Sequence, residues 1–309
     1  MAQLITIGEI LVEIMATRIG QTFLEPGTLV GPYPSGAPAI MIDQAARLGA
    51  DCAIVACVGR DDFGTLNIER LKKDGVNTSG IAVRADQTTG CAFVGYAADG
   101  SRKFIFHFTH AAAGALTKDD VPEALFEDVR IFHIMGCSLT SSASLREAVL
   151  AGARLAKEKG ARLSFDPNIR PELLTDDSLK DAFDWIMENC DILLTGRSEL
   201  EQVTGLAAEE AVRDMRARGK YAVVIKDGSR GARIVAEGVD TVMPSYHVTE
   251  VDPTGAGDCF DGAFLASLLA GKTLQEAASI GNAAGAVSVT RKGPMEGAAM
   301  PEEIAAIRA

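Results

Sequence analysis

Short apolar runs recur along the chain, and from about residue 116 onward they alternate with segments of helical periodicity. The apolar runs predict strands at 4–7, 52–58, 131–135, 162–165, 192–194 and 222–226. The periodic segments predict helices at 38–48, 65–74, 143–159, 177–188, 198–204 and 208–218. Such alternation predicts an α/β fold with a mostly parallel sheet covered by helices on both faces.

A different pattern occupies residues 80–109. Two strand-like runs, 87–96 and 103–108, are joined through Asp99-Gly100, a dipeptide typical of hairpin turns. Together with strands near 12–24, this hairpin predicts a small β-sheet that stands off the main body. We therefore expect a single domain over residues 1–309, with a β lid formed by about 12–34 and 82–109.

Polar residues and glycines follow several of the predicted strands. In open parallel sheets, ligands bind beyond the carboxyl ends of the strands. Those ends carry Gly8-Glu9, Gly59-Arg60-Asp61, Asp166-Pro167-Asn168, Thr195-Gly196 and Lys226-Asp227-Gly228. We expect the functional site at this edge of the sheet.

The stretch from Asp252 to Gly262 carries the strongest chemical signal. It opens a predicted helix with Gly255-Ala256-Gly257, whose backbone amides would form an anion site at the helix N-terminus. Asp258 adds a carboxylate beside that site. A base next to fixed N–H donors is what phosphoryl transfer to an alcohol requires. Taken alone, the motif could also be a tight turn with a capping aspartate.

Composition narrows the class of partner. The net charge of −12 argues against a nucleic-acid binder or a protein of anionic membrane surfaces, whose binding faces are basic. The six cysteines include no C-x-x-C pair, which is typical of buried thiols in a reducing compartment. We see no signal peptide, and no apolar stretch reaches the roughly 18 residues of a membrane span. These features predict a cytoplasmic protein.

Taken together, several ordered motifs resemble those of the ribokinase-like (PfkB) carbohydrate kinases over nearly the whole chain. They are Gly36-Ala37-Pro38-Ala39, residues 58–64, the 252–258 stretch continuing through Phe260 and Gly262, Asn282 and Ser288. The resemblance implies a three-layer α/β/α core with a small β-sheet lid. It also implies transfer of the ATP γ-phosphoryl group to a sugar hydroxyl. Asp258 would act as the base, and Gly255, Ala256 and Gly257 would hold the transferring group.

The resemblance also implies an ATP site. Lys226, Gly228 and Gly231 match the loop under the phosphates and ribose, and Gly257 would touch the phosphates. Asn282 matches a position near adenine. The alternatives are a strand-ending turn for the glycines and a helix-packing amide for Asn282.

For metal ions, Glu199 matches an acidic residue that holds Mg²⁺ through water. The family usually has asparagine three residues earlier, where this chain has Gly196, and an ordinary glutamate in the first turn of a helix is the alternative. Asp252 and Thr254 match a monovalent-cation site, for an ion such as K⁺, in some family members.

For the acceptor, the resemblance implies that Gly36, Ala37, Glu13 and Arg170 contact the sugar, together with Asp258. Glu13 stands where the family often has aspartate, and Ile40 where it often has asparagine. On the lid strand, where keto-acid kinases of this family typically carry tyrosine and arginine to hold a carboxylate, this chain reads Phe106-His107-Phe108-Thr109-His110 with no arginine.

We therefore expect a neutral ketohexose, such as fructose or tagatose, phosphorylated on a primary hydroxyl. The alternatives are a 2-keto-3-deoxygluconate kinase, a nucleoside kinase, or a regulator that binds sugar or nucleotide without catalysis. His107 or His110 could bond a sugar hydroxyl, with a surface or lid-face histidine as the alternative.

The predicted lid also bears on oligomeric state. Its hairpin offers an open strand edge and three apolar side chains, Phe104, Phe106 and Phe108. Exposed strand edges tend to be covered, and lids in this family often pair. We therefore expect a homodimer formed through the lid.

Overall fold

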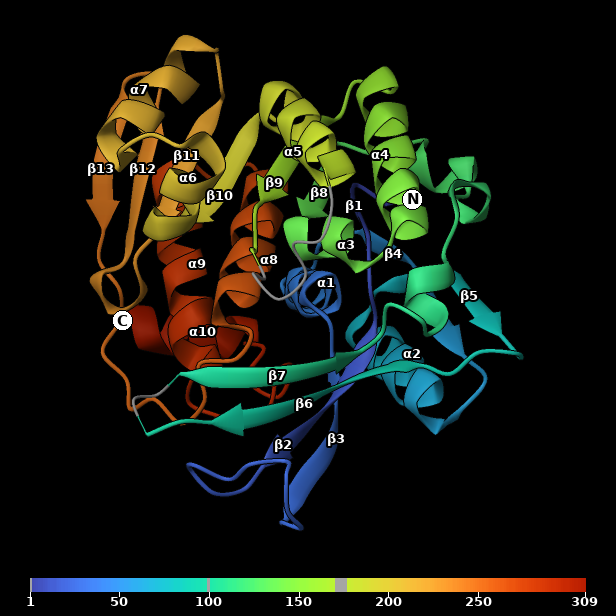
Figure 1. Ribbon diagram of the computed structural model, residues 1–309. Helices are drawn as coiled ribbons and strands as arrows, with labels where there is room; N and C mark the ends of the chain where they lie inside the picture. The colour runs from blue at the N-terminus through green and yellow to red at the C-terminus, as the bar shows by residue number, and fades with distance from the viewer. Residues whose placement is uncertain (1, 99–100, 170–176) are drawn as a thin grey trace.

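The computed structural model describes residues 2–98, 101–169 and 177–309 (Figure 1). Within these residues, nine strands form the main sheet in the order β13-β12-β11-β10-β9-β8-β1-β4-β5. The strands are β1 (Leu4–Ile7), β4 (Cys52–Gly59), β5 (Asn77–Arg84), β8 (Ile131–Met135), β9 (Arg162–Asp166), β10 (Ile192–Gly196), β11 (Ala222–Lys226), β12 (Ala232–Ala236) and β13 (Val239–Met243). Neighbours from β5 to β11 pair in parallel, and β12 and β13 add an antiparallel edge. The predicted mostly parallel sheet is confirmed.

Helices cover both faces of this sheet, as the alternating sequence pattern predicted (Figure 1). One face is covered by α4 (Ala143–Glu158), α5 (Asp177–Asn189), α6 (Arg197–Thr204) and α7 (Ala208–Ala217). The other is covered by α1 (Ala37–Arg47), α2 (Asp62–Asp74), α8 (Ala256–Leu269) and α9 (Leu274–Ser288). The short α3 (Gly136–Ser141) follows β8, and α10 (Pro301–Arg308) packs on α9.

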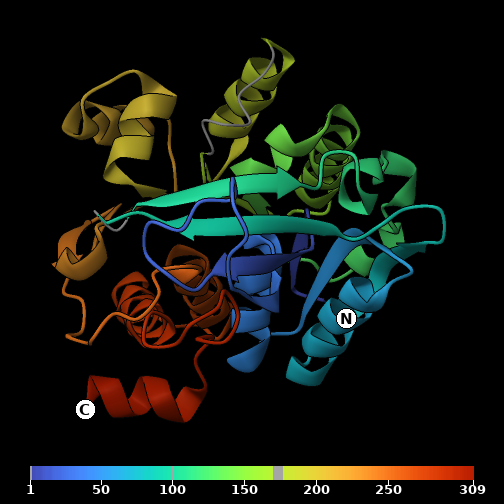
Figure 2. The same cartoon turned by 60° about the horizontal axis from the view of Figure 1, so that its bottom comes forward.

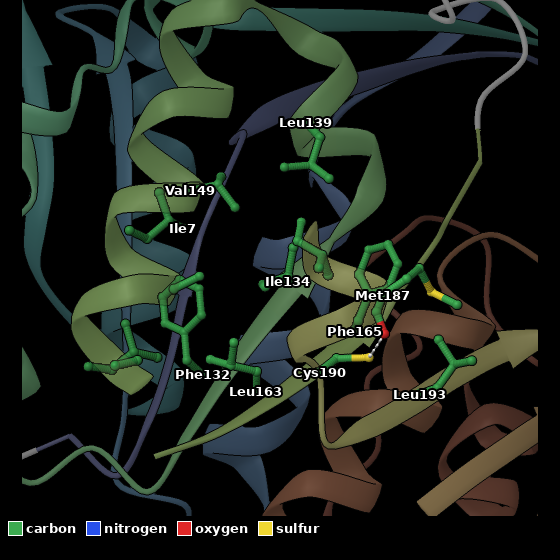
Figure 3. Packing of buried hydrophobic residues seen from close by; sticks show 14 of the residues in the cluster. Ile7, Phe132, Ile134, Leu139, Val149, Leu163, Phe165, Met187, Cys190 and Leu193 are labelled. Atoms are coloured by element: carbon green, nitrogen blue, oxygen red, sulfur yellow. Dashed lines mark hydrogen bonds between the residues drawn. The ribbon is translucent and has the colours of Figure 1, made fainter. Parts of the chain in front are cut away.

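The period-two alternation of the central strands builds a separate core on each side. In β1, Ile5 and Ile7 belong to the cluster under α4, whereas Leu4 belongs to the opposite cluster. Figure 3 shows part of the first cluster, with Ile7 of β1, Phe132 of β8 and α4 side chains lying together. Burying each large side chain contributes roughly 1.5–3 kcal/mol, so these layers fix the positions of the strand ends.

A second sheet forms the lid. Its order is β3-β2-β6-β7, with β2 (Leu11–Ala16), β3 (Leu29–Ser35), β6 (Gly90–Tyr96) and β7 (Arg102–His107). The β2–β6 pair is parallel, and the other two pairs are antiparallel. In Figure 2 the teal strands β6 and β7 cross the molecule between the yellow-green and the red helices.

The element boundaries differ from expectation in several places. Residues 82–84, expected in the lid, belong to β5 of the main sheet. Three strands of the main sheet, β5, β12 and β13, were not predicted. Polar residues interrupt the apolar pattern of β5 and β13, and β12 is only five residues long. Helix α2 starts three residues before the predicted 65, since the Asp61 carboxylate accepts from the Gly64 amide as an N-cap. The predicted turn at residues 99–100 lies outside the described residues.

Candidate active site

The first turn of α8 forms a backbone cradle at the edge of the main sheet. Gly255 has φ +79°, and a Cβ there would lie 2.6 Å from the carbonyl oxygen of Pro294, so glycine is needed for this close approach. The helix then runs buried from Asp258 to Ser267, packed against α1 and α9. The first N–H groups of a helix have no partner within it and carry partial positive charge, so this turn suits an anion.

Two cavities meet at this turn. The first, of about 230 Å³, lies between the lid and the strand ends, and we name it the acceptor cavity. The second, of about 420 Å³, lies beside the loop after β11 and helix α9, and we name it the nucleotide cleft. Four residues line both: Lys226, Pro253, Ala256 and Gly257. The cradle is therefore a shared wall that can be reached from either side.

Asp258 faces the acceptor cavity from the first turn of α8. It is only 7% exposed, and its Oδ1 accepts a hydrogen bond of 3.2 Å from Nδ2 of Asn168. Asn168 has φ +39°, a conformation that asparagine adopts more readily than most residues. Its backbone amide donates to Oδ1 of Asp166. The turn after β9 therefore holds the side chain that orients Asp258. The sequence placed residues 166–168 at the site edge but did not assign this contact.

Lys226, expected at the ATP site, lies in a buried ion-pair cluster. Its Nζ lies 2.8 Å from Asp166 Oδ2 and 3.0 Å from both carboxylate oxygens of Asp261. Burial disfavours the ammonium ion, but the two carboxylates outweigh it and raise the pKa of Lys226. The ammonium also lies 3.5 Å from where a Cβ of Gly257 would be. A fixed positive charge thus sits beside the cradle.

The remaining residues expected at ATP line the nucleotide cleft. Gly231 has φ +95°, and a Cβ there would collide with the carbonyl oxygen of Met243, whereas Gly228, with φ +54°, faces open space. The side-chain amide of Asn282 donates to the carbonyl oxygens of Met243 and Pro244 at 2.9 and 3.0 Å. Asn282 therefore also holds the wall of the cleft in place.

Glu199 lines the acceptor cavity at the start of α6. Its carboxylate accepts from the backbone amides of Gly196, at 2.9 Å, and Ile169, at 3.2 Å. A Cβ at Gly196 would lie 3.0 Å from Glu199 Oε2, so the departure from the family pattern leaves room for this bond. The carboxylate is consequently fixed at the cavity wall rather than loose on the surface.

The acceptor cavity has an acidic floor. Gly36, with φ +114°, lets the start of α1 approach the carbonyl oxygen of Glu9, and Ala37 follows it in the cavity wall. Glu13 is buried and its Oε1 accepts from Ser35 Oγ at 2.7 Å. Burial raises the pKa of Glu13 to about 7, against the opposing effects of the Ser35 hydrogen bond and the Arg102 charge. Glu13 therefore titrates near neutrality.

An apolar residue completes the floor. Ile40 is 3% exposed and lines the acceptor cavity, and its Cγ2 lies 3.3 Å from where a Cβ of Gly255 would be. In place of the asparagine common in the family, this chain packs a hydrocarbon side chain under the cradle. The cavity therefore has one polar group fewer at that position.

The lid supplies an aromatic roof. Alternate residues of the hairpin, Phe104, Phe106 and Phe108, line the acceptor cavity. Among the described residues β7 is an open edge of the lid sheet, as expected, but these three side chains do not lie on an exposed surface. His107 points the other way and packs edge-on against Phe93, and His110 is exposed. Arg102, at the start of β7, also lines the cavity. Its place on the lid strand corrects the expectation that this strand carries no arginine.

Asp252 and Thr254 lie in the turn that leads into α8. Asp252 is 1% exposed, and its Oδ1 accepts from both the amide and the hydroxyl of Thr254, at 3.1 and 2.7 Å. Its Oδ2 accepts from the amide of Gly293, at 3.1 Å, and the hydroxyl of Tyr96, at 3.3 Å. Both oxygens of this carboxylate therefore have protein donors.

Arg170 and the segment 59–61 were also expected at the site. Arg170, expected near the sugar, lies outside the described residues. The segment Gly59-Arg60-Asp61 lines neither cavity among the described residues. Asp61 instead caps α2 and accepts from the amide and hydroxyl of Thr89 at 2.7 Å each, which ties the base of the lid to the main sheet.

Within the described residues, no helix combines the length and apolar character needed to cross a membrane.

Comparisons with known proteins agree with the geometry of this site. Fructokinase-1 of Oryza sativa subsp. japonica is 32% identical, covering 98% of this chain and 96% of its own. An E. coli protein assigned as ribokinase II, crystallised with ATP and Mg²⁺, is 44% identical with a TM-score of 0.95, covering 100% of this chain and 99% of its own.

Fructokinase of Xylella fastidiosa with bound ATP is 25% identical with a TM-score of 0.87, covering 99% of this chain and 98% of its own. The family model of the pfkB carbohydrate kinases matches residues 1–301. A ribokinase-like fold, two cavities that share a helix N-terminus, and these likenesses agree: the chain belongs to the pfkB family of carbohydrate kinases.

Proposed function

We propose that this kinase transfers the γ-phosphoryl group of ATP to a primary hydroxyl of a neutral ketohexose such as fructose or tagatose. The observation that carries the proposal is the shared wall: the first turn of α8 borders both the acceptor cavity and the nucleotide cleft. A sugar on one side and a triphosphate on the other would meet at the same backbone amides.

In this proposal Asp258 takes the proton of the acceptor hydroxyl. Asn168 holds the Asp258 carboxylate in place through its 3.2 Å hydrogen bond. The amides of residues 255–257 and the Lys226 ammonium stabilise negative charge on the group in transfer. Fixed donors of this kind are worth roughly 3 kcal/mol each in the transition state. A carboxylate is a weak base, and it suffices because the proton moves late in a loose phosphoryl transfer.

The cleft residues fit ATP and Mg²⁺. Gly228 leaves open space at the cleft, where a ribose and its phosphates can lie against backbone. Carboxylates of Glu199 and Asp166 line the cavity near the cradle and would hold Mg²⁺ through its water ligands. Among the described residues there is no group of three acidic, cysteine or histidine side chains to bind a metal directly. When bound, Mg²⁺ neutralises phosphate charge.

The walls of the acceptor cavity favour a neutral sugar over a keto-acid. Glu9 and Glu13 place carboxyl groups on the floor, and each would repel a sugar carboxylate when ionised, which for Glu13 means above its raised pKa of about 7. The one lid cation in the described wall, Arg102, donates from Nη1 to Thr254 at 2.9 Å and keeps further N–H donors, which is why a keto-acid belongs in the acceptor panel. The relatives named fructokinase support the same choice.

The test is release of ADP in a coupled assay over a panel of acceptors: fructose, tagatose, ribose, 2-keto-3-deoxygluconate and adenosine. We expect the highest kcat/KM with a ketohexose. Turnover only with 2-keto-3-deoxygluconate or adenosine would overturn the sugar assignment. Binding of ATP without turnover on any acceptor would favour a regulator that has lost catalysis.

We also propose a monovalent-cation site at Asp252 and Thr254. The Asp252 carboxylate already accepts four hydrogen bonds from the protein, so a K⁺ ion there would rest mainly on carbonyl oxygens. We therefore expect only weak activation. Initial rates in matched K⁺, Na⁺ and choline buffers measure it directly.

We also propose a homodimer formed through the lid, although not through its phenylalanines. The outer face of the lid exposes other apolar side chains, among them Leu24 at 96%, Leu29 at 39% and Ile105 at 36%. Leu29 and Ile105 line a hollow on that face. Covering this surface with a second copy would remove it from water. Light scattering at micromolar concentration tests the proposal, and a monomeric mass would contradict it.

A further inference from the structure

The lid is fastened to the turn that precedes α8 by two side chains from neighbouring strands. Tyr96 ends β6 and Arg102 begins β7, and the two residues are directly paired across the strands. Nη1 of Arg102 donates to Oγ1 of Thr254 at 2.9 Å, and the hydroxyl of Tyr96 donates to Oδ2 of Asp252 at 3.3 Å. We name these two contacts the lid latch.

The latch ends on groups that define the shape of the turn. The Thr254 hydroxyl that receives the Arg102 bond in turn donates to Asp252 Oδ1 at 2.7 Å. The same carboxylate accepts from the amides of Thr254 and Gly293. Arg102, Thr254 and Asp252 thus form a continuous chain of donors and acceptors. The next residue, Gly255, is where the cradle begins, so a displaced turn would move the cradle amides.

Arg102 also borders the acceptor cavity. Its guanidinium carbon lies 5.6 Å from the centre of the Phe104 ring, which is part of the aromatic roof. Its charge acts on Glu13 in the floor and lowers the pKa of that carboxyl against the effect of burial. One side chain therefore touches the roof, acts on the floor and bonds to the turn before the cradle.

We propose that Arg102, assisted by Tyr96, is a positioning residue that couples closure of the lid over the sugar to the alignment of the cradle amides. The proposal rests on the kinase activity proposed above. When the lid is docked, Thr254 is held and the amides of residues 255–257 point at the group in transfer. When it is not, the turn is freed and the reaction slows, because misplacement by about 1 Å can cost on the order of 100-fold in rate.

The kinetic test compares Arg102→Ala, Arg102→Lys and Tyr96→Phe with the control Lys103→Ala. Lys103 is the neighbouring exposed residue of the same strand and lines neither cavity among the described residues. With the preferred sugar, we expect Arg102→Ala to lower kcat roughly 10- to 100-fold while KM for ATP changes less than about 3-fold. Millimolar guanidinium ion should restore part of the kcat, and Arg102→Lys should fall between alanine and wild type. The control should match wild type.

Several kinetic outcomes would overturn the proposal. A higher sugar KM with unchanged kcat would make Arg102 a sugar-binding residue instead. Failure of guanidinium ion to raise the kcat of a folded Arg102→Ala protein would contradict a positioning role. If Arg102→Ala does not fold, Tyr96→Phe removes a single oxygen, and wild-type kinetics of that variant would equally count against the latch.

Hydrogen exchange separates the latch from the activity. We expect amides in residues 252–258 to exchange at least about 10-fold faster in Arg102→Ala than in wild type, with β11 unchanged. Equal exchange in that segment would overturn the latch even if the enzyme phosphorylates fructose. If residues 252–258 exchange faster in Arg102→Ala but the wild-type protein phosphorylates none of the sugars, the latch would be supported and the proposed function would be contradicted.

Discussion

The side-chain amide of Asn168 donates to the carboxylate of Asp258 over 3.2 Å, although the two residues are 90 positions apart in the chain. One comes from the turn after β9 and the other from the first turn of α8. Among the described residues, the Oδ1 of Asn168 has no hydrogen-bond donor. The amide nitrogen therefore orients the carboxylate of Asp258, the proposed base, and we expect the amide oxygen to accept from a hydroxyl of the bound sugar.

Replacing Asp258 with asparagine removes the proposed base and keeps the shape of the side chain. We expect Asp258→Asn to lower kcat by roughly 10²- to 10⁴-fold, which is the usual worth of a general base. ATP should still bind with near wild-type affinity by calorimetry, because the nucleotide cleft lies on the other side of the cradle. Asp240→Asn, on the exposed strand β13, is the matched control. An unchanged kcat would refute the role of Asp258.

Asn168→Asp tests the contact that orients the base. The new carboxylate would face that of Asp258, and like charges disfavour the ionised form, so the pKa of Asp258 should rise. The acid limb of the kcat–pH profile should therefore move to higher pH, by about one unit if the two groups interact by about 1.4 kcal/mol. Aspartate tolerates the positive φ of residue 168, so the fold should persist. An acid limb that stays in place would show that the two side chains are not coupled.

Glu13 should make sugar binding depend on pH. Burial raises the pKa of Glu13 to about 7, so the group is protonated below that pH and ionised above it. An ionised oxygen accepts more strongly from a sugar hydroxyl, and among the described residues Oε2 of Glu13 has no donor. We expect the sugar KM to rise as the pH falls from about 8 to about 6. In the Glu13→Gln variant the sugar KM should not change with pH over this range. A pH dependence equal to that of wild type would assign the titration to another group.

Two glycines of the nucleotide cleft form a matched pair. A methyl group at Gly228 meets open space, so Gly228→Ala should cost only the strain of a positive φ, about 1–2 kcal/mol. A methyl group at Gly231 would collide with the carbonyl of Met243, so Gly231→Ala should cost more and move the cleft wall. Urea unfolding should rank Gly231→Ala as the less stable variant, and KM for ATP should rise in both, because both glycines line the nucleotide cleft. The reverse order would contradict the close approach of this loop to Met243.

Local sequence rules identified the cradle because its signals are contiguous. Glycines, a helix start and an acidic residue lie within seven positions, 252–258, so local backbone geometry places the Asp258 carboxylate beside the amides without any distant contact. The alternation of strands and helices was likewise readable, since burial on both faces leaves long apolar runs. The three phenylalanines of the lid hairpin were recognised as a set and expected to support dimer formation, because periodicity shows that they share a face and does not show that this face covers the acceptor cavity.

The contacts between distant segments could not be read in this way. Lys226 was expected at the nucleotide, yet its partners Asp166 and Asp261 come from another strand and from α8. Nothing in the spacing of these residues pairs them, because the sheet order brings β9 and β11 to either side of β10. Arg102 was missed for a related reason: only the packing of the lid against the turn before α8 shows where it points.

A single helical turn separates the two cavities, and this constrains the order of events. Because the phosphoryl group could pass directly from ATP to the sugar across this turn, both substrates would have to be bound before either product leaves. Such an enzyme would work through a ternary complex, would give intersecting lines in two-substrate kinetics, and would invert the configuration of a chiral phosphate. A molecule that joins a hexose to adenosine through a polyphosphate bridge would span both cavities and compete with both substrates at once.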